Sequence, residues 1–272
     1  MLCLGIESSC DETALALVRD GRLIGQRLRS QIDLHALFGG VVPELASREH
    51  GRVVGALYDL LLQDCGVAGA EIDAIAVARG PGLLGSLLVG VSFAQALALA
   101  LNQPIVGVNR LRAHLRAAGL EGDVSFPALG ILVSGGHTHI CHVKSPVEFT
   151  LLGKSLDDAA GEAVDKFGKL LGLPYPAGRF IDEFGAGARA VPGMFPRPYL
   201  DNDNFDFSFS GLKTAASLFL KSRPHLRFDM RHSDGDRRLC PVPSAGAAED
   251  LPQVCASFQL ACAEPLRVRR ER

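Results

Sequence analysis

Short apolar runs separated by polar turns open the chain and set its first structural prediction. They predict three strands joined as a meander of hairpins, at residues 2–6, 14–18 and 22–29. A longer segment, 44–65, carries apolar residues at helical spacing and is followed by Gly66, which predicts a helix and its end. Further apolar runs at 72–78 and 104–108 predict two buried strands. The alternation of strands and helices indicates an α/β fold.

Residues 83–101 are apolar almost throughout and approach the ~20 residues that span a bilayer. The segment contains Gly85, Gly90 and Gln95, and predicted strands lie on both sides of it. These features favour a buried helix of a soluble protein that covers a sheet, rather than a membrane span.

The opening pattern returns later in the chain. A strand at 128–133, a polar loop at 134–138 and strands at 139–143 and 149–154 repeat the strand, loop, strand, turn, strand order. An offset of roughly 125 residues is too long for a solenoid period and implies a duplicated lobe. Paired hairpins of this kind bind the nucleotide in actin, Hsp70 and sugar kinases, which raises an ATP-type ligand as a hypothesis.

The duplication predicts three regions. We expect a first actin-like lobe, a partial second lobe and a divergent loop and tail, at residues 1–125, 126–222 and 223–272. Residues 231–238 are polar and 241–250 are rich in proline, alanine and glycine, which predicts a loop or an unpacked tail. The last arginines are expected to form a solvated basic end: Arg267, Arg269, Arg270 and Arg272.

Composition narrows the class of protein. The 272 residues are 47% hydrophobic and 21% charged, which is typical of a globular chain. A net charge of -2 provides no general attraction to nucleic acid, so RNA binding requires a local basic patch. Seven scattered cysteines without a C-x-x-C pair, and an N-terminus without a basic segment before an apolar core, favour a cytoplasmic protein with reduced thiols and no signal peptide.

Two glycine-containing loops are candidates for anion binding. In loop 134–138, Gly135 and Gly136 allow backbone N–H groups to approach a phosphate, although a plain hairpin turn explains the pattern equally well. Residues 80–86 open a helix in a similar way. There, simple helix entry and close packing are the favoured interpretation.

Acidic residues gather at two places. Glu7, Asp11 and Glu12 lie in the first hairpin loop, where a ligand, a metal or water must offset their repulsion, and this functional interpretation is preferred over a solvated turn. Residues 157–166 start a helix with an acidic cap, and Asp158, Glu162 and Asp165 are expected to share one face. That face either holds a ribose hydroxyl or, as the spacing favours, forms a surface ion pair between Asp165 and Lys169.

The histidines give a weak metal signal. His114 stands alone, because the position one helical turn earlier is Arg110. His137 and His139 alternate along a strand and either chelate a metal or simply form hydrogen bonds. The chain has no H-e-x-x-H pattern, so a metalloprotease is the least favoured interpretation.

Seven motifs together carry a resemblance to a known family. They occur in order at residues 5–13, 39–48, 80–86, 134–138, 157–166, 173–176 and 207–215. In sequence and order they resemble the TsaD family of tRNA N6-adenosine threonylcarbamoyltransferases, formerly described as glycoproteases. The resemblance covers residues 1 to about 220 and is too extensive for chance.

The resemblance implies an actin-like (ASKHA) fold of duplicated ribonuclease-H-like lobes, the second incomplete. It implies transfer of a threonylcarbamoyl group from threonylcarbamoyl-AMP to N6 of the adenosine 3′ of the anticodon in tRNA. Asp11 and Glu12 match the catalytic acidic pair, and His114 matches a ligand of Fe²⁺ or Zn²⁺. The expected substrate-binding residues are Leu132, Val133, Ser134, Gly135, Gly136, Asp165, Gly178 and Asp182. The expected partners are tRNA and TsaB-like and TsaE-like subunits, without a membrane.

The sequence departs from the family pattern at the metal helix and at the C-terminus. The family places a histidine where this chain has Arg110, and arginine does not deprotonate to bind a metal. The family's later nucleotide-binding region and its metal-binding aspartate have no counterpart after Gln259. Besides an impaired transferase, two alternatives therefore stay open: a non-catalytic partner subunit resembling TsaB, and an ATPase or sugar kinase of the same fold.

Overall fold

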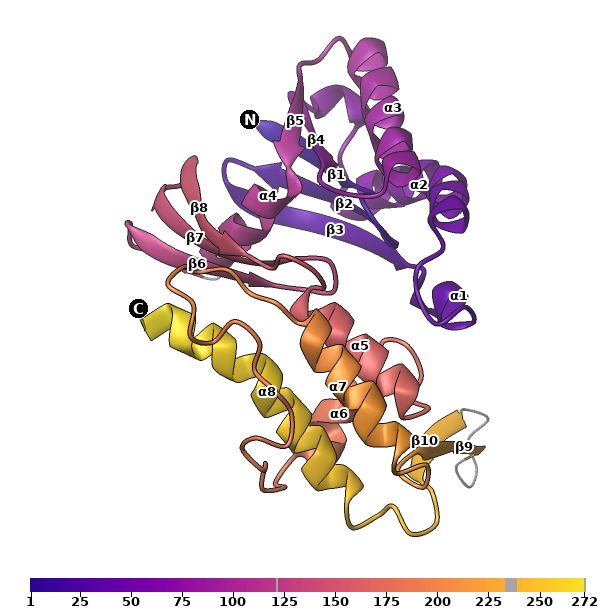
Figure 1. Cartoon of the computed structure of the whole chain (residues 1–272). Helices are drawn as coiled ribbons and strands as arrows, with labels where there is room; N and C mark the ends of the chain where they lie inside the picture. Colours follow the sequence, from indigo (N-terminus) through magenta and orange to yellow (C-terminus); the bar gives the residue numbers. More distant parts are fainter. Residues whose placement is uncertain (121, 233–238, 272) are drawn as a thin grey trace. The chain divides into compact units, whose positions relative to one another are not determined.

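The computed structural model describes residues 1–120, 122–232 and 239–271 (Figure 1). The chain forms two compact units, Met1–Leu120 and Glu121–Arg272. Their division falls near the expected boundary at residue 125. The final 50 residues, which composition separates as a third region, belong to the second unit.

A five-stranded mixed sheet forms the centre of the first unit, in the order β3-β2-β1-β4-β5. Its strands are β1 (Leu2–Glu7), β2 (Glu12–Arg19), β3 (Arg22–Ser30), β4 (Ala74–Gly80) and β5 (Ile105–Asn109). The first three strands are antiparallel, whereas β4 runs parallel to β1 and β5 parallel to β4. The predicted meander and the two later strands are confirmed. The prediction that both later strands are buried is wrong for β5, in which Ile105 and Val106 are 40% and 56% exposed.

Helices cover one face of this sheet (Figure 1). The helical segments of the unit are α1 (Ile32–Ala36), α2 (Pro43–Cys65), η1 (Gly69–Glu71), α3 (Leu84–Leu101), α4 (Arg110–Ala117) and η2 (Ala118–Leu120). Leu4, Leu17 and Ile75 of the sheet are fully buried against α2 and α3. The helix α2 ends where the sequence predicts, because Gly66 adopts a left-handed φ of 61°.

The helix α3 is less buried than its composition predicts. Only its small residues Ser86, Gly90, Ala94 and Ala98 are buried, and they allow the helix backbone to approach the sheet closely. Leu84, Leu88 and Leu99 face outward and are 84%, 62% and 86% exposed, whereas Leu97 and Leu101 pack against the core. Among the described residues, α3 is the one helix long and apolar enough to cross a membrane by length and composition. The expectation of a buried helix is therefore wrong for the outer face of α3, whereas the expectation that this helix covers the sheet is confirmed.

The sheet of the second unit repeats the opening meander of the first. Its strands are β6 (Ala128–Val133), β7 (Thr138–Ser145) and β8 (Glu148–Lys154), antiparallel in the order β6-β7-β8. In the described part of the unit, no parallel strand extends this sheet as β4 and β5 extend the first. Leu129, Ile131 and Val133 of the edge strand β6 are exposed. This is the α/β duplication with an incomplete second lobe that the sequence predicts.

A helical layer supplies most of the second core. Its elements are α5 (Ala160–Leu170), α6 (Gly178–Gly185), α7 (Ser210–Lys221) and α8 (Leu251–Glu271), with the hairpin strands β9 (Phe228–His232) and β10 (Leu239–Pro243). At the centre, the rings of Phe167 and Phe258 stack with centroids 3.9 Å apart. Phe195 packs edge-on against both rings.

The predicted unpacked tail is wrong for the described residues after 238. The helix α8 buries Val254, Phe258 and Ala261 in the core, because its apolar residues recur at helical spacing. The basic end is not fully solvated either: Arg269 is 2% exposed and donates hydrogen bonds to the carbonyls of Tyr199 and Asn202. Residues 233–238 of the predicted polar loop, and Arg272, lie outside the described residues.

Phe258→Ala tests whether α8 belongs to the folded unit. Removing a fully buried, stacked ring should cost about 3–5 kcal/mol of the free energy of unfolding, measured by urea unfolding. Leu218→Ala is the control, because Leu218 is 61% exposed on α7 and its loss should change stability by about 0.5 kcal/mol or less. Equal, small effects of both substitutions would show that α8 does not complete the core.

Candidate functional site

The first hairpin loop, between β1 and β2, is held by the entry to α3. The Ser8 hydroxyl donates to the Ser86 carbonyl at 2.8 Å, and the Leu83 N–H donates to the Ser9 carbonyl at 2.8 Å. A Cβ on Gly82 would lie 2.5 Å from that same carbonyl oxygen, so only glycine permits the approach. This supports the close-packing interpretation of residues 80–86.

The carboxylates of this loop have different surroundings. Glu7 accepts hydrogen bonds from both the N–H and the hydroxyl of Ser9, the former at 2.6 Å. Burial, and secondarily the negative charge of Asp11, raise the pKa of the neighbouring Cys10 to about 11, so this thiol stays protonated. Glu12 is exposed at the start of β2. The expected catalytic pair of Asp11 and Glu12 thus lies in the first unit, and its role stays a prediction.

Buried histidines that the sequence analysis missed support the same loop. His50 Nε2 donates to the Cys10 carbonyl at 3.0 Å, and its Nδ1 accepts from the Thr13 hydroxyl at 2.7 Å. Because a carbonyl only accepts, this contact fixes the tautomer. Gln31 links His50 to His35, both fully buried. The available signal was a polar residue on the apolar face of α2, in line with the buried Ala46 and Val54.

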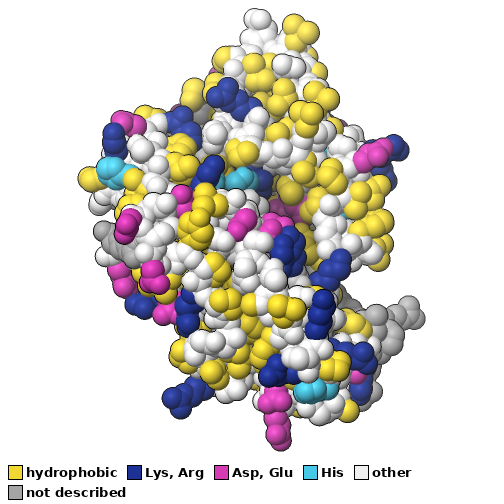
Figure 2. Space-filling view, in the orientation of Figure 1, with side chains coloured by type: hydrophobic (Ala, Val, Ile, Leu, Met, Phe, Trp, Pro, Cys, Tyr) yellow, Lys and Arg dark blue, Asp and Glu magenta, His cyan; other side chains and the backbone are white. Residues whose placement is uncertain are grey.

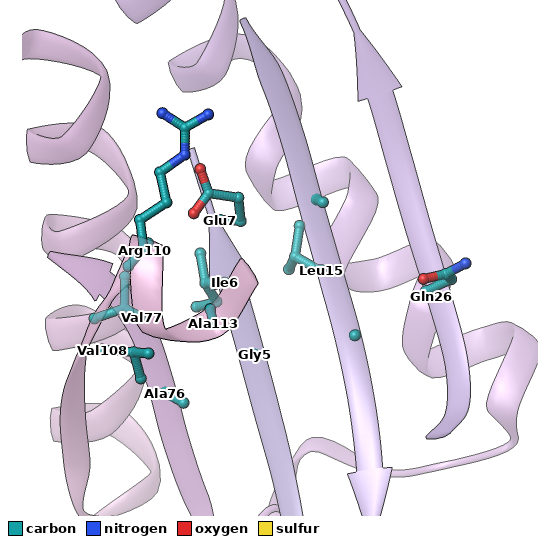
Figure 3. Close-up of a pocket in the computed structure, with 13 residues that line it drawn as sticks. Gly5, Ile6, Glu7, Leu15, Gln26, Ala76, Val77, Val108, Arg110 and Ala113 are labelled. Atoms are coloured by element: carbon teal, nitrogen blue, oxygen red, sulfur yellow. The ribbon is translucent and has the colours of Figure 1, made fainter. Parts of the chain in front are cut away.

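A pocket of about 310 Å³ lies on the face of the first sheet that α2 and α3 leave uncovered (Figure 3). Small residues form its floor: Gly5, Ala14, Ala16, Ala76 and Ala78. Glu7 from the end of β1 and Arg110 from the start of α4 stand together at its rim. From the sequence, Arg110 is noted only as the residue that replaces a metal-binding histidine of the family. The structure places its side chain at the rim of a cavity.

The donor set at His114 does not fit the expected Fe²⁺ or Zn²⁺. Among the described residues, no group of three or more His, Cys, Asp or Glu side chains is close enough to hold a metal ion. His114 instead neighbours Arg110, whose positive charge, after burial, lowers the pKa of the imidazole. His137 and His139 lie with ring centroids 5.4 Å apart, edge to face, and are two donors rather than three.

The second hairpin loop, between β6 and β7, is held like the first. The Ser134 hydroxyl accepts the N–H of His137 at 3.0 Å and that of Gly136 at 3.3 Å. The Gly161 N–H, at the start of α5, donates to the Ser134 carbonyl at 3.2 Å. A Cβ on Gly161 would lie 2.7 Å from that oxygen and 2.8 Å from the Gly135 nitrogen. The loop and α5 therefore share one rigid backbone contact.

A pocket of about 450 Å³ opens between this loop, α5, α6 and α8. It brings together four residues that the sequence predicts to bind substrate: Val133, Gly135, Asp165 and Gly178. Leu132, Ser134 and Gly136 are the sequence neighbours of the lining residues Val133 and Gly135. Asp182 lies one turn beyond Gly178 along α6 and accepts a hydrogen bond from the Gln259 side chain at 2.9 Å. The pocket also contains Arg179, a cation that the sequence analysis did not assign.

Asp165 is turned toward α6 rather than toward the surface. Its carboxylate accepts the Ala177 N–H at 2.8 Å, and Ala177 precedes the first residue of α6. Burial raises the pKa of Asp165, and the backbone donors of Ala177 and Gly178 oppose that rise. The favoured prediction of a surface ion pair with Lys169 is wrong, because the half-buried carboxylate accepts a backbone hydrogen bond at the pocket wall.

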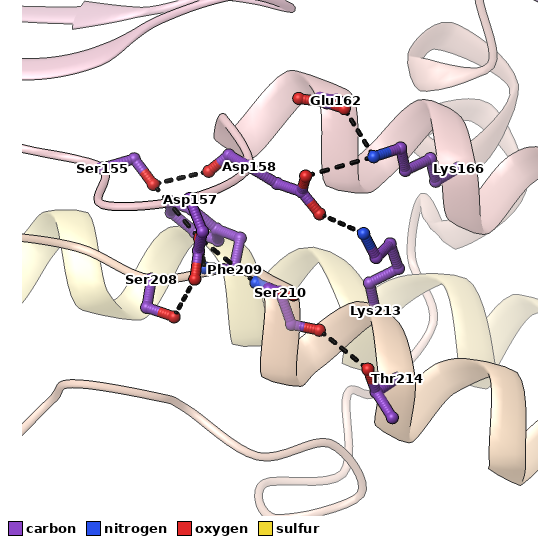
Figure 4. A network of polar contacts seen from close by, with 10 residues as sticks. All are labelled: Ser155, Asp157, Asp158, Glu162, Lys166, Ser208, Phe209, Ser210, Lys213 and Thr214. Carbon is purple, nitrogen blue, oxygen red and sulfur yellow. Dashed lines mark hydrogen bonds and ion pairs between the residues drawn. The ribbon is translucent and has the colours of Figure 1, made fainter.

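The acidic residues before α5 do not cap that helix, contrary to the sequence-based expectation. Ala159 is its N-cap, without a side-chain hydrogen bond. Asp157 instead accepts the N–H groups of Phe209 and Ser210, at 2.8 and 3.3 Å, at the start of α7 (Figure 4). The residue spacing could not reveal this, because the two segments are brought together only by folding.

Asp158 joins α5 to α7 through two lysines (Figure 4). Its carboxylate lies 2.6 Å from Lys213 Nζ and 3.1 Å from Lys166 Nζ, and it is 16% exposed. Burial alone would raise its pKa, but the hydrogen bonds from Lys213 and Lys166 lower it overall. Glu162 also pairs with Lys166, at 2.5 Å. Asp158 and Glu162 thus form a network of ion pairs with Lys166 and Lys213, whereas Asp165 faces the pocket.

Asp158→Asn should reduce stability most at neutral pH. The folded chain holds this pKa below its ordinary value of 3.8, so ionised Asp158 stabilises the fold above that pH and loses this effect as pH falls. Urea midpoints at pH 7, 5 and 3 should show the deficit of the variant shrinking toward pH 3. Asp203→Asn, at an exposed loop position, is the control. A deficit that is constant with pH would contradict the charge-based explanation.

Comparisons with known proteins agree on one family. The sequence profile described as TsaD, tRNA N6-adenosine threonylcarbamoyltransferase, matches residues 22–272. A protein of that name from Nitratidesulfovibrio vulgaris is 60% identical over 269 residues, which are 99% of this chain and 73% of the relative. One from Lawsonia intracellularis is 54% identical over 272 residues, or 100% and 75% of the two chains.

Solved structures are more distant. YeaZ from Pseudomonas aeruginosa is 21% identical with a TM-score of 0.39, covering 55% of this chain and 63% of its own. Component A of (R)-2-hydroxyglutaryl-CoA dehydratase from Acidaminococcus fermentans is 12% identical with a TM-score of 0.49, covering 100% and 78%. Identity with the sequence relatives is far higher and extends over almost the whole chain. The chain therefore belongs to the TsaD family, whose members are described as tRNA N6-adenosine threonylcarbamoyltransferases.

Proposed function

We propose that this chain transfers the threonylcarbamoyl group of threonylcarbamoyl-AMP to N6 of the adenosine 3′ of the anticodon, in tRNAs that read codons starting with A. The observation that carries the proposal is the pocket of about 450 Å³ in the second unit, which unites residues from three separate motifs of the family. Gly135, Asp165 and Pro176 are 41 residues apart at most in the sequence, yet line one cavity.

The pocket has the chemistry that an adenylate requires. The exposed backbone of Gly135 and the guanidinium of Arg179 suit a phosphate, and Arg179 is the stronger of these partners because it stays charged. Asp165 keeps acceptor capacity for ribose hydroxyls beyond its bond from Ala177. Val133 and Val164 offer apolar surface to a base.

The reaction breaks the bond between the acyl carbon and a phosphate oxygen, and forms a bond from that carbon to N6. AMP leaves with the electron pair, and the amine loses one proton. We assign removal of that proton to the pair Asp11 and Glu12, because these residues match the family's catalytic acidic pair and a carboxylate can accept a proton. No step is assigned to a metal, because the donors around His114 do not fit one.

Gly161→Ala tests the pocket directly. The added methyl would meet the Ser134 oxygen and the Gly135 nitrogen at under 3 Å, so the loop must move away from bound adenylate. AMP affinity, measured by titration calorimetry, should fall about tenfold or more. Gly55→Ala is the control, because Gly55 has open space around its Cβ position on α2. Unchanged AMP binding by the Gly161 variant would place the adenylate elsewhere.

A tRNA partner requires a basic surface, since the net charge of -2 supplies no general attraction. Lys221, Arg223, Arg227 and Arg231 provide one along the end of α7 and β9, and they are exposed. Figure 2 shows several lysine and arginine side chains in the lower part of the view, which is the part where Figure 1 draws β9 and the end of α7. Asp229 pairs with Arg227 and Arg231 only at 3.7 and 3.6 Å, so both guanidinium groups stay available to phosphates.

Replacing Arg227 and Arg231 together by glutamine should weaken tRNA binding. If both contact phosphates, the slope of log Kobs against log salt should fall by about 0.7–0.9 per contact, measured by filter binding. The double variant of Arg267 and Arg270 is the control, because it removes the same charge from exposed arginines of α8, which lie outside the proposed surface. Equal salt-dependence slopes for the two double variants would show that Arg227 and Arg231 do not contact the RNA.

The expected TsaB-like and TsaE-like subunits need a contact surface of their own. The outer face of α3 supports such a contact, because Leu84, Leu88 and Leu99 form an exposed apolar stripe. We assign this face to a partner subunit in the cytoplasm rather than to a membrane. If the chain binds AMP and a partner but never transfers the acyl group, it is the non-catalytic subunit that the sequence leaves open.

A further inference from the structure

Arg179 is held at the wall of the pocket of about 450 Å³ in the second unit. It is the second residue of α6, and Asp165 fixes the start of that helix by accepting the Ala177 N–H at 2.8 Å. The guanidinium carbon of Arg179 lies 4.4 Å from the centroid of the Phe180 ring, which itself packs against the core. This cation–π contact supports the exposed guanidinium beside the cavity.

Arg179 also supplies the positive charge of this pocket. Among the described residues that line the cavity, the charged side chains are Asp165 and Arg179. The Asp165 carboxylate is half-buried and accepts a backbone hydrogen bond, whereas the guanidinium is exposed and stays protonated at any pH at which a protein folds. An anion that enters the pocket therefore meets a permanent cation.

The proposed transfer changes the charge of the phosphate that stays in the pocket. In threonylcarbamoyl-AMP the phosphate is bonded through oxygen to both the ribose and the acyl carbon, so it carries a single negative charge. When the acyl carbon bonds to N6, its bond to the phosphate oxygen breaks and that oxygen keeps the electron pair. The product AMP is a phosphate monoester with a second pKa of about 6, so at neutral pH it carries nearly one charge more.

We propose that Arg179 makes the pocket select the more highly charged phosphate, and so hold the product AMP more tightly than the acyl adenylate. An added charge beside a cation strengthens their attraction, and a guanidinium binds two oxygens of one phosphate at once. The same cation stabilises the charge that develops on the leaving oxygen, and it makes free AMP an inhibitor of the next transfer. This inference rests on the proposed function, which takes the pocket as the adenylate site.

The other titratable groups near Arg179 come from three helices. Asp182 and Glu183 lie one turn further along α6, and Asp182 accepts a hydrogen bond from Gln259 of α8 at 2.9 Å. Burial raises the pKa of Cys262 on α8 to about 12, so its thiol stays protonated. Burial also raises the pKa of Asp165 on α5. Adenosine has no phosphate, so the pH dependence of its binding reports these groups separately from Arg179.

The experiment measures the affinities of the full chain for AMP, for its singly charged 5′-methyl ester and for adenosine, by titration calorimetry at pH 5 and pH 7.5. At pH 7.5 the unaltered chain should bind AMP about tenfold more tightly than the methyl ester. At pH 5 this ratio should shrink, because AMP has lost most of its second charge. Arg179→Gln should bring the two affinities within about twofold at both pH values.

Two further variants serve as controls. Arg179→Lys keeps the charge and should retain most of the preference for AMP. Arg189→Gln removes the same charge from an exposed position after α6 and should bind all three compounds like the unaltered chain. Circular dichroism melting checks that each variant is folded.

Equal affinities of the unaltered chain for AMP and the methyl ester, or an undiminished preference in Arg179→Gln, would overturn the inference. Transfer to tRNA alongside either result would leave the proposed function standing. The expected affinities without any transfer would support the role of Arg179 and refute the transferase. If none of the three compounds binds, the adenylate site and the inference are both wrong.

Discussion

The close approach of a helix entry to a hairpin loop is the constraint on which both units depend. In the first unit, Gly82 lies against the Ser9 carbonyl, and in the second, Gly161 lies against the Ser134 carbonyl. In each case a backbone N–H from the helix entry donates to that carbonyl, from Leu83 and from Gly161 itself. A side chain at either glycine would force the backbones apart, so both loops keep a fixed position relative to their sheets.

Fixed loops make the two candidate sites possible in different ways. In the second unit, the clamped loop forms one wall of a pocket, and Asp165 fixes another wall by accepting the Ala177 N–H before α6. The ion pairs of Asp158 with Lys166 and Lys213 hold α7 to α5. In the first unit, the loop places acidic residues at the end of β1, supported from below by the buried hydrogen bonds of His50 and Thr13. Binding groups thus rest on backbone contacts rather than on mobile side chains.

The rim of the first pocket shows how one residue changes the chemistry of an otherwise preserved frame. Asn109 caps α4 and Arg110 is the first residue of the helix, which places the Arg110 side chain beside Glu7 at the end of β1. The guanidinium at this position supplies a permanent positive charge and hydrogen-bond donors. The family resemblance of the whole chain and the distinct electrostatics of this point are therefore compatible.

The sequence by itself determined the strands of both meanders, the helix from Pro43 to Cys65 and the motifs that identify the family. Period-2 and helical patterns, and the turn chemistry of glycine, act over a few residues and can be read along the chain. It did not determine α8, because a proline- and charge-rich context obscured an apolar face that acquires meaning only against Phe167.

Only the tertiary structure decided which polar groups meet. Asp157 caps α7 instead of its own helix, His50 reaches the Cys10 carbonyl, and Arg179 enters the cavity with Asp165. Each of these contacts joins segments that sequence spacing does not relate. The reason is physical: a buried hydrogen-bonding group must be paired with whichever partner folding brings within reach, and that partner is set by the packing of sheets and helices.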